Sequence, residues 1–372
     1  MRKWLSVWSC CLLLVCSAQA ATVRYFSGEI EEGRVELTPK GFTLGSKGGT
    51  TTTLDLVSIM ELTLQKSTGS PSTLPAGVML INGTTIADGT IPPLEGAAVE
   101  IGAEHLAVPV AAIGAVLMTS LPREKIEANP AGQTGALLPN GDFFPGTFLG
   151  IKGAKVTLNS TLFGPQSFNS KSQISAAFLR DSKPLATRFV LSTTHGSRFL
   201  LDDLQMDGAG VMFKDSLLGA IKIKREDLAA LHAGTGRYKW LGELAPTIAV
   251  SPGVDANTAL RLPKDRPKDD DAAPLTFSTA ANATLSYAIP AGFTAFVTSV
   301  SLPYDAPATA RVVFSVYGDG RPLFRTPPFS PSDKPARIRV DLRGVRVLAI
   351  RVEPSTLSSA SFGDWIGPVL LR

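Results

Sequence analysis

The sequence predicts an all-β protein, with an N-terminal array of small β-hairpin or barrel-like repeats followed by a C-terminal β-sandwich. Short runs of Val, Ile, Leu, Phe and Thr alternate with polar residues, as in residues 34–37, 155–158 and 310–317, which is typical of half-buried strands. The 34 Gly and 27 Pro residues punctuate these runs throughout the chain of 372 residues. Helical periodicity rarely persists beyond a turn or two, so strands are expected nearly everywhere.

The first twenty residues have the pattern of a secretory signal peptide. Arg2 and Lys3 precede the apolar run 12–15, and the segment ends in Ala18-Gln19-Ala20. A positive start, a short apolar middle and an A-x-A end predict cleavage after Ala20. The apolar run is too short to span a membrane, and Val15 before Cys16 does not suit a lipoprotein signal. We therefore expect an exported protein, periplasmic or extracellular, with no transmembrane segment after cleavage.

Removal of this segment would change the chemistry available to the chain. Cys10, Cys11 and Cys16 all lie within it, so the remaining 352 residues (372 − 20) contain no cysteine. Disulfides, thiolate metal sites and cysteine nucleophiles are then excluded. The formal net charge would fall from +4 to +2 with the loss of Arg2 and Lys3. A balance so close to neutral does not indicate a nucleic-acid partner.

Residues 21–235 contain an internal repeat. Gly83, Gly141 and Gly196 follow similar apolar segments at intervals of 58 and 55 residues. Each unit is predicted to hold a hairpin, a glycine break, further strands and a short apolar segment that is either a strand or one helical turn. Asn82-Gly83 and Asn140-Gly141 are expected to form type I′ turns. The ranges are about 75–120 (unit 1), 133–181 (unit 2) and 186–233 (unit 3), with a partial unit at 21–65.

One such unit is too small to bury its own apolar face. Several in a row could pack as a small barrel or as a stacked sheet. Residues 236–274 follow and are expected to form a connector. Its stretch 261–274 carries three prolines and eight charges, which predicts a solvated loop. Asp269-Asp270-Asp271 lacks the alternating spacing that turns carboxylates toward one calcium ion.

Residues 275–372 are predicted to form the sandwich, which could begin near residue 238. Turn signals separate about seven strands, at 284–289, 293–302, 311–317, 321–324, 336–342, 346–352 and 365–371. Short antiparallel strands at this spacing are typical of a β-sandwich.

Three motifs stand out in this part of the chain: Leu285-Ser-Tyr-Ala-Ile289, Val312-Val-Phe-Ser-Val-Tyr-Gly-Asp-Gly320 and Asp364-Trp365. With the lead-in Trp240-Leu-Gly-Glu-Leu-Ala-Pro246, they resemble the NPCBM/NEW2 family (novel putative carbohydrate-binding module) over about residues 238–372. This resemblance implies a galactose-binding-like β-sandwich (jelly roll) that binds glycans. The chain departs from the family pattern at residues 276–281, where a Gly-hydrophobic-His step is usual, and at 302–306, which has one acid instead of two.

Sugar binding requires aromatic planes for the apolar face of a pyranose and polar groups for its hydroxyls. Aromatic and polar residues lie side by side at three places in the predicted sandwich. The alternative interpretations are core packing for Trp365 and Tyr317 and a turn role for Asp319. The candidate ligand-binding residues are Tyr304, Asp305, Tyr317, Asp319, Arg321, Asp364 and Trp365.

No catalytic motif is found. The three histidines, His105, His195 and His232, are far apart in sequence, which favours structural or surface roles over a shared metal site. Neither H-E-x-x-H, G-x-S-x-G nor a Walker loop is present, and no pair of carboxylates is singled out for glycoside hydrolysis. We therefore expect neither enzymatic activity nor a metal or cofactor.

Two functional hypotheses from different classes follow. The first is glycan or polysaccharide recognition at the cell envelope by the C-terminal sandwich. The alternative is a structural or scaffolding role, in which the repeats and the sandwich contact an envelope protein partner. A third hypothesis makes the chain an accessory of an enzyme encoded elsewhere.

Overall fold

The computed structural model describes residues 21–26, 29–45, 49–65, 73–128, 132–251, 255–261, 276–355 and 362–372. The predicted signal peptide and the Asp269–Asp271 run lie outside these residues. Over the described ranges the chain is built of strands, with one short α-helix, α1 (Arg123–Glu127), and four 3₁₀ turns. The all-β prediction is confirmed. No helix in the described part is long and apolar enough to cross a membrane.

The repeat units share one strand order. A hairpin opens each unit, a small excursion of two or three strands follows, and a closing strand returns to pair antiparallel with the first strand. In the partial unit the second strand of the hairpin also begins the excursion. The first strands are β1 (Ala21–Tyr25), β7 (Gly77–Leu80), β13 (Gly135–Leu137) and β19 (Phe189–Thr193), and the closing strands are β5 (Ile59–Thr63), β11 (Ile113–Leu117), β18 (Ala176–Phe178) and β24 (Leu228–Ala233).

The other strands complete the hairpins and excursions. A separate pair, β6 (Thr73–Leu74) and β12 (Leu121–Pro122), flanks unit 1. In units 1 and 3 a single 3₁₀ turn precedes the closing strand: η1 (Val110–Ala112) and η2 (Arg225–Asp227). The remaining strands are β2 (Ile30–Thr38), β3 (Gly41–Gly45), β4 (Thr51–Thr53), β8 (Thr85–Ala87), β9 (Ala98–Ile101), β10 (Leu106–Pro109), β14 (Phe143–Pro145), β15 (Thr147–Lys152), β16 (Lys155–Ser160), β17 (Gly164–Asn169), β20 (Arg198–Leu201), β21 (Gln205–Met206), β22 (Gly210–Asp215) and β23 (Gly219–Lys224).

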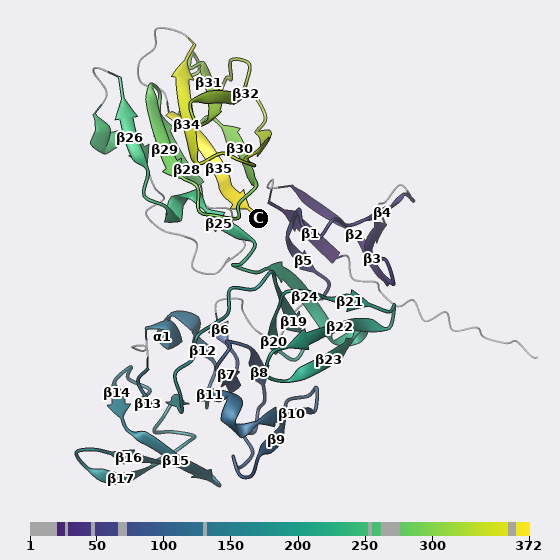
Figure 1. The fold of residues 1–372 in the computed structure, drawn as a ribbon, viewed down its shortest axis with the longest axis vertical. Helices are drawn as coiled ribbons and strands as arrows, with labels where there is room; N and C mark the ends of the chain where they lie inside the picture. The colour runs from purple at the N-terminus through teal and green to yellow at the C-terminus, as the bar shows by residue number, and fades with distance from the viewer. Residues whose placement is uncertain are drawn as a thin grey trace, which may run out of the picture.

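Pairing between units joins them into one 14-stranded sheet (Figure 1). The closing strands β11 and β18 pair units 1 and 2, and β5 and β24 pair the partial unit with unit 3. A bridge between β8 and β20 connects these two halves. Each unit buries its apolar face by adding to its neighbours, as expected for stacked repeats.

The turn glycines adopt the same conformation in units 1, 2 and 3. Gly83, Gly141 and Gly196 have φ of 93°, 93° and 98°, and each donates its N–H to the carbonyl three residues earlier. The type I′ prediction is wrong, because Asn82 and Asn140 are not among the residues with positive φ. The hairpins instead use a three-residue loop, a type I turn closed by a left-handed glycine, so only the glycine needs φ > 0.

The C-terminal part is a two-layer β-sandwich. One sheet has six strands in the order β27-β28-β35-β30-β33, with β25 paired to β35, and the other has five in the order β26-β29-β34-β31-β32. Inward side chains of both sheets form one core that includes Phe277, Tyr287, Phe296, Phe314 and Trp365. The strands are β25 (Tyr238–Trp240), β26 (Thr247–Val250), β27 (Leu260–Arg261), β28 (Thr276–Ala280), β29 (Ala283–Ala288), β30 (Ala295–Ser301), β31 (Val312–Gly318), β32 (Arg321–Arg325), β33 (Ala336–Asp341), β34 (Val347–Pro354) and β35 (Phe362–Leu371).

Residues 236–274 were predicted as a connector, with a sandwich start near residue 238 as the alternative. Three strands in this range, β25, β26 and β27, pair with β35, β29 and β28 respectively, and the short turns η3 (Leu241–Glu243) and η4 (Ala256–Thr258) lie between them. These strands cover backbone groups that would otherwise remain unpaired along β29, β28 and β35. The described part of the connector therefore belongs to the sandwich.

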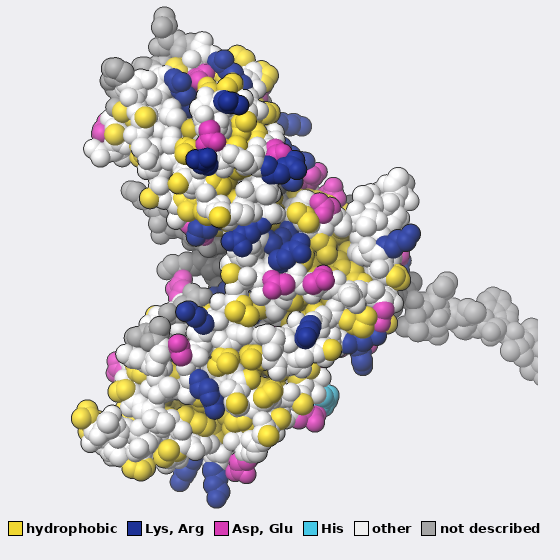
Figure 2. All heavy atoms as spheres, viewed as in Figure 1, with side chains coloured by type: hydrophobic (Ala, Val, Ile, Leu, Met, Phe, Trp, Pro, Cys, Tyr) yellow, Lys and Arg dark blue, Asp and Glu magenta, His cyan; other side chains and the backbone are white. Residues whose placement is uncertain are grey.

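An apolar cluster joins the sandwich to the repeats. Phe26 and Met60 of the partial unit pack with Trp240, Val297 and Val369 of the sandwich. In Figure 1 the end of β35 lies beside β1 and β5. Basic and acidic side chains are intermixed over the visible face of the molecule (Figure 2), in agreement with the small net charge.

Candidate functional site

Polar side chains collect on the outer face of the six-stranded sheet, at one end of β28, β30 and β35. Alternation along β35 turns Trp365 inward and its neighbour Asp364 outward. Asp364 lies directly opposite Ser278 on β28 and Ser301 on β30. This register places one carboxylate between two strands that present small hydroxyl side chains.

The Asp364 carboxylate is half-buried and hydrogen-bonded. The Ser278 hydroxyl donates to its Oδ1 at 2.6 Å. Burial raises the pKa of Asp364 above its ordinary value, and the charge of nearby Asp305 raises it further, whereas the Ser278 hydrogen bond lowers it. The carboxylate has lost part of its water shell while both oxygens retain capacity to accept hydrogen bonds.

Aromatic and cationic side chains lie on the neighbouring strands and on the loop that follows β30. Phe362 lies two residues before Asp364 on the same outer face, and the Arg261 guanidinium carbon is 3.6 Å from the centre of its ring, which is a close cation–π contact. Arg261 is itself opposite Ser278. Tyr304, in the loop after β30, is fully exposed, and Asp305 follows it. We call the set Arg261, Ser278, Tyr304, Asp305, Phe362 and Asp364 the Asp364 face.

Trp365 does not contribute to this face, which corrects its place among the predicted ligand-binding residues. Its side chain is 0% exposed. The indole packs edge-on against Phe314, with ring centres 5.3 Å apart, and its Nε1 donates to the Thr279 hydroxyl at 2.6 Å. The aromatic–acid pair seen in the sequence is split between the two faces of the sheet because strand side chains alternate.

The structure places Tyr317, Asp319 and Arg321 away from the Asp364 face. β31 begins near that end of the sandwich and runs to Gly318, so the β31–β32 turn lies at the opposite end. Asp319 has φ of 49° and accepts hydrogen bonds from the N–H groups of Arg346 and Val347. Asp319 therefore fixes a turn, as the alternative interpretation expected.

Tyr317 joins a cluster on the outer face of the five-stranded sheet. Its hydroxyl is 3.3 Å from Oε1 of Glu353, and the same carboxylate pairs with Arg325 at 2.9 Å and Arg351 at 3.5 Å. Glu353 thus pairs with both cations, although Arg351 Nε is buried without a hydrogen-bond partner among the described residues. Arg321 is exposed at the start of β32.

Three residues of the Asp364 face, Arg261, Ser278 and Phe362, were not among the predicted binding residues. Phe362 and Asp364 are two positions apart, so the period of a strand would have placed them together. Arg261 carried no comparable signal, because the charged residues that follow it predicted a solvated loop. Only the pairing of β27 with β28 brings Arg261 to Phe362.

The histidines are separate, and none faces another. His105 contacts Glu100 at 2.6 Å and His195 contacts Asp227 at 3.4 Å. Burial lowers the pKa of His232 to about 4, with smaller effects from the charges of Arg198 and Arg123. Within the described ranges no group of three or more His, Cys, Asp or Glu residues could hold a metal ion.

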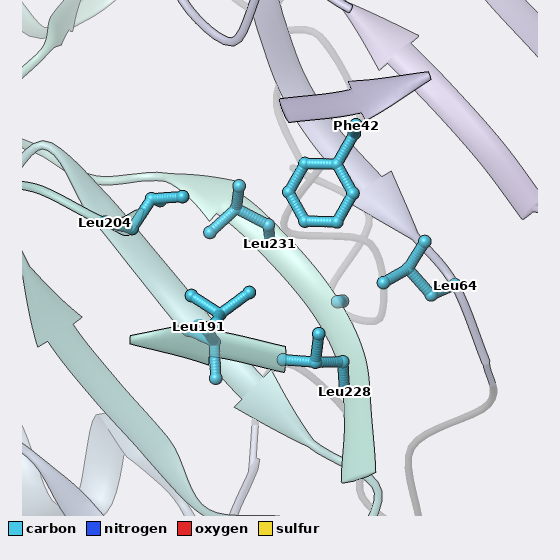
Figure 3. Close-up of a pocket in the computed structure, with 8 residues that line it drawn as sticks. Phe42, Leu64, Leu191, Leu204, Leu228 and Leu231 are labelled. Carbon is cyan, nitrogen blue, oxygen red and sulfur yellow. The ribbon is translucent and has the colours of Figure 1, made fainter. Parts of the chain in front are cut away.

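A small pocket between the partial unit and unit 3 is lined by apolar side chains alone (Figure 3). Without a polar group to orient a ligand it represents imperfect packing. Its lining residues are Phe42, Leu64, Leu191, Leu204, Val211, Leu228, Ala230 and Leu231.

Comparison with known proteins bears on the sandwich. Residues 277–371 match the family model of the NPCBM/NEW2 domain. This match confirms the family resemblance and covers the strands from β28 to β35. No curated protein matches the chain.

Two of the solved structures similar to the chain consist of CBM51 modules. A CBM51 module from a Clostridium perfringens GH95 protein, solved in complex with methyl-galactose, is 17% identical, with 36% of this chain and 99% of that one covered and a TM-score of 0.29. The tandem CBM51 modules of a family 98 glycoside hydrolase from Streptococcus pneumoniae are 9% identical, with 94% of this chain and 88% of that one covered and a TM-score of 0.31.

Proposed function

We propose that the chain is a non-catalytic glycan-binding protein and that the Asp364 face holds the sugar. The observation that carries this proposal is the half-buried Asp364 carboxylate, hydrogen-bonded to Ser278 and flanked by the ring of Phe362. The NPCBM/NEW2 match over residues 277–371 supports it.

The chemistry of the face suits a pyranose. A partly desolvated carboxylate accepts hydrogen bonds from two vicinal hydroxyls at a smaller cost in lost hydration than a fully exposed one. Arg261 supplies donors to a ring or hydroxyl oxygen. The exposed Tyr304 provides a plane for the apolar face of the sugar, and the Phe362 ring holds the Arg261 guanidinium in place.

We further propose that the protein acts outside the cytoplasm and carries no hydrolytic activity of its own. The pattern of residues 1–20 supports export. The absence of any sequence-identified catalytic carboxylate pair supports a binding role, in which the repeats present the sandwich to an extracellular polysaccharide.

A glycan array with the full chain tests the proposal. Wild type is expected to bind at least one class of galactose-, glucose- or N-acetylglucosamine-terminated glycan. Asp364→Asn and Tyr304→Ala should each reduce binding about 10-fold or more, the loss expected for one hydrogen-bonded or stacked contact. Arg321→Ala, at the opposite end of the sandwich, is the matched control and should bind as wild type. Folded protein that binds no glycan, or binding that only Arg321→Ala weakens, would refute the proposal.

The scaffolding alternative has one observation in its favour. Leu149, Leu162 and Phe163, all in or beside the excursion of unit 2, are exposed apolar side chains, and such patches mark protein contacts. This observation concerns the repeats and is compatible with sugar binding by the sandwich.

A further inference from the structure

Units 1 and 3 dock on each other reciprocally. We define the excursion tip of each unit as residues 102–105 in unit 1, 160–163 in unit 2 and 215–218 in unit 3. Asp215 at the tip of unit 3 accepts hydrogen bonds from Asn82 and Thr84 in the first turn of unit 1. Glu104 at the tip of unit 1 accepts from Thr193 and Ser197 in the first turn of unit 3.

The two docking contacts use equivalent positions. Leu80 N–H donates to the Thr84 carbonyl, and Thr193 N–H donates to the Ser197 carbonyl, so Thr84 and Ser197 correspond. The residues that follow them, Thr85 and Arg198, bridge β8 to β20. Because equivalent residues face each other, units 1 and 3 are related approximately by a twofold rotation.

The first turn of the partial unit also makes a contact, in this case with the sandwich. Tyr25 N–H donates to the Glu29 carbonyl, which makes Glu29 the counterpart of Thr84 and Ser197. Glu29 forms an ion pair with Arg337 of the sandwich at 2.5 Å. In three units, therefore, this turn position contacts a group of another unit or of the sandwich.

Unit 2 presents the same surface without such a contact. Leu138 N–H donates to the Asp142 carbonyl, so Asp142 occupies the equivalent position. Asn140, Gly141 and Asp142 are exposed, and the Asp142 carboxylate accepts only from Asn140 of its own turn among the hydrogen bonds of the described residues. β14, the counterpart of β8 and β20, is the edge strand of the 14-stranded sheet.

The excursion tip of unit 2 is correspondingly exposed. Leu217 and Leu218 of unit 3 are half-buried against the apolar core that units 1 and 2 share. Their counterparts in unit 2, Leu162 and Phe163, are 83% and 66% exposed. Phe163 stacks on Phe144 of β14, with ring centres 6.2 Å apart, so the exposed tip lies beside the free edge. Hydrophobic side chains are visible at this end of the molecule in Figure 2, below β14 of Figure 1.

We propose that a second copy of the chain docks on unit 2, and that the two copies pair as units 1 and 3 pair within one chain. In this twofold dimer Phe143, the counterpart of Thr85 and Arg198, lies opposite Phe143 of the second copy. Leu162 and Phe163 of each copy pack against unit 2 of the other. A closed twofold contact removes the exposed strand edge.

The side chains of unit 2 suit pairing with themselves. Units 1 and 3 place an acid at the tip and a hydroxyl in the turn, whereas unit 2 has Asp142 in the turn and the exposed Thr161 at the tip. A hydroxyl at the tip of one copy therefore donates to the carboxylate of the other, and two acids never face each other. Pro145 has no N–H, so the pairing of β14 with β14 of the second copy ends two residues after Phe143. This contact is short, like the single bridge between β8 and β20.

Sedimentation of the full chain over a concentration series tests the dimer. We expect a monomer–dimer equilibrium in the micromolar range. Phe163→Gln and Asp142→Ala should each raise the dimer dissociation constant at least 10-fold. Leu185→Gln, an exposed apolar residue outside the unit 2 surface, should leave it unchanged. Thermal melting of each variant establishes that it is folded. A wild-type chain that stays monomeric up to 1 mM, or a dimer unaffected by Phe163→Gln, would overturn the proposal.

Cross-linking then tests the register. Cys10, Cys11 and Cys16 are replaced by Ser, and Phe143→Cys is added as the sole thiol. A short bismaleimide should link two copies of this variant, and Leu185→Cys in the same background should stay monomeric. Dimers that fail to cross-link through Phe143→Cys would contradict the twofold arrangement.

Discussion

The indole Nε1 of Trp365 donates a 2.6 Å hydrogen bond to the Thr279 hydroxyl inside the closed core of the sandwich. Both residues are fully buried and lie on strands that pair with each other, β35 and β28. The bond satisfies the one polar group of an indole that otherwise packs against apolar side chains.

Thr279→Val should therefore destabilise the protein without affecting glycan binding. The substitution preserves shape and leaves the indole N–H unpaired, which costs about 1–3 kcal/mol. Urea unfolding compares it with Thr276→Val, on the same strand but facing outward. Equal unfolding free energies for the two variants would argue against the buried bond.

Asp364→Asn should change how stability depends on pH. The pKa of Asp364 is raised in the folded state, so the folded protein retains this proton to a higher pH than the unfolded chain does. The free energy of unfolding then falls as pH rises from the ordinary Asp value toward the folded value. Asp364→Asn removes that fall. Urea titrations of wild type and variant between pH 3.5 and 7 measure this fall in the free energy of unfolding. The same pH dependence in both proteins would contradict its attribution to Asp364.

His232 should produce the opposite slope. Its pKa is lowered to about 4 by burial, even though Glu61 lies 3.7 Å from its Nδ1. Between pH 6.5 and 4 the unfolded chain binds a proton that the folded protein does not, so stability decreases as pH falls, by about 2 to 3 kcal/mol. His232→Gln should flatten this decrease. His105→Gln, on an exposed turn, is the control and should leave it intact.

Asp215→Ala should disrupt the docking of units 1 and 3. The buried carboxylate accepts from Asn82, Thr84 and the N–H groups of Leu217 and Leu218. Leaving these donors without an acceptor should cost about 3 kcal/mol or more. Ser160→Ala removes the equivalent residue of unit 2, which accepts one long hydrogen bond from Leu162 N–H, and should cost less than about 1 kcal/mol. Chemical denaturation measures the unfolding free energy of both variants. Equal losses for Asp215→Ala and Ser160→Ala would contradict the docking role of Asp215.

The sequence predicted the strand composition, the repeats and the sandwich, because alternation and turn residues are local signals. The interval between Gly83, Gly141 and Gly196 located equivalent turns correctly, although the turn type depended on a backbone path that Asn-Gly pairs do not specify alone. Pairing between distant strands carried no local signal. For that reason β25, β26 and β27 were expected as a connector, and the contact of Arg261 with Phe362 was not foreseen.

Three of the candidate binding residues belong to the proposed Asp364 face, and whether they bind a sugar stays a prediction. Tyr304 and Asp305 lie in the loop that follows Ser301, the residue of β30 that is opposite Asp364. Trp365 and Asp364 were grouped because they are adjacent in sequence, but adjacent residues of a strand face opposite sides. Tyr317, Asp319 and Arg321 are at the far end, separated by the length of β31.

A crystal structure of the full chain with its best-bound array glycan tests the central claim most directly. We expect the sugar on the Asp364 face, with a hydroxyl within hydrogen-bond distance of the Asp364 carboxylate and its apolar side against Tyr304. A sugar bound instead at the β31–β32 turn, or over the Glu353 cluster on the opposite sheet, would contradict the account.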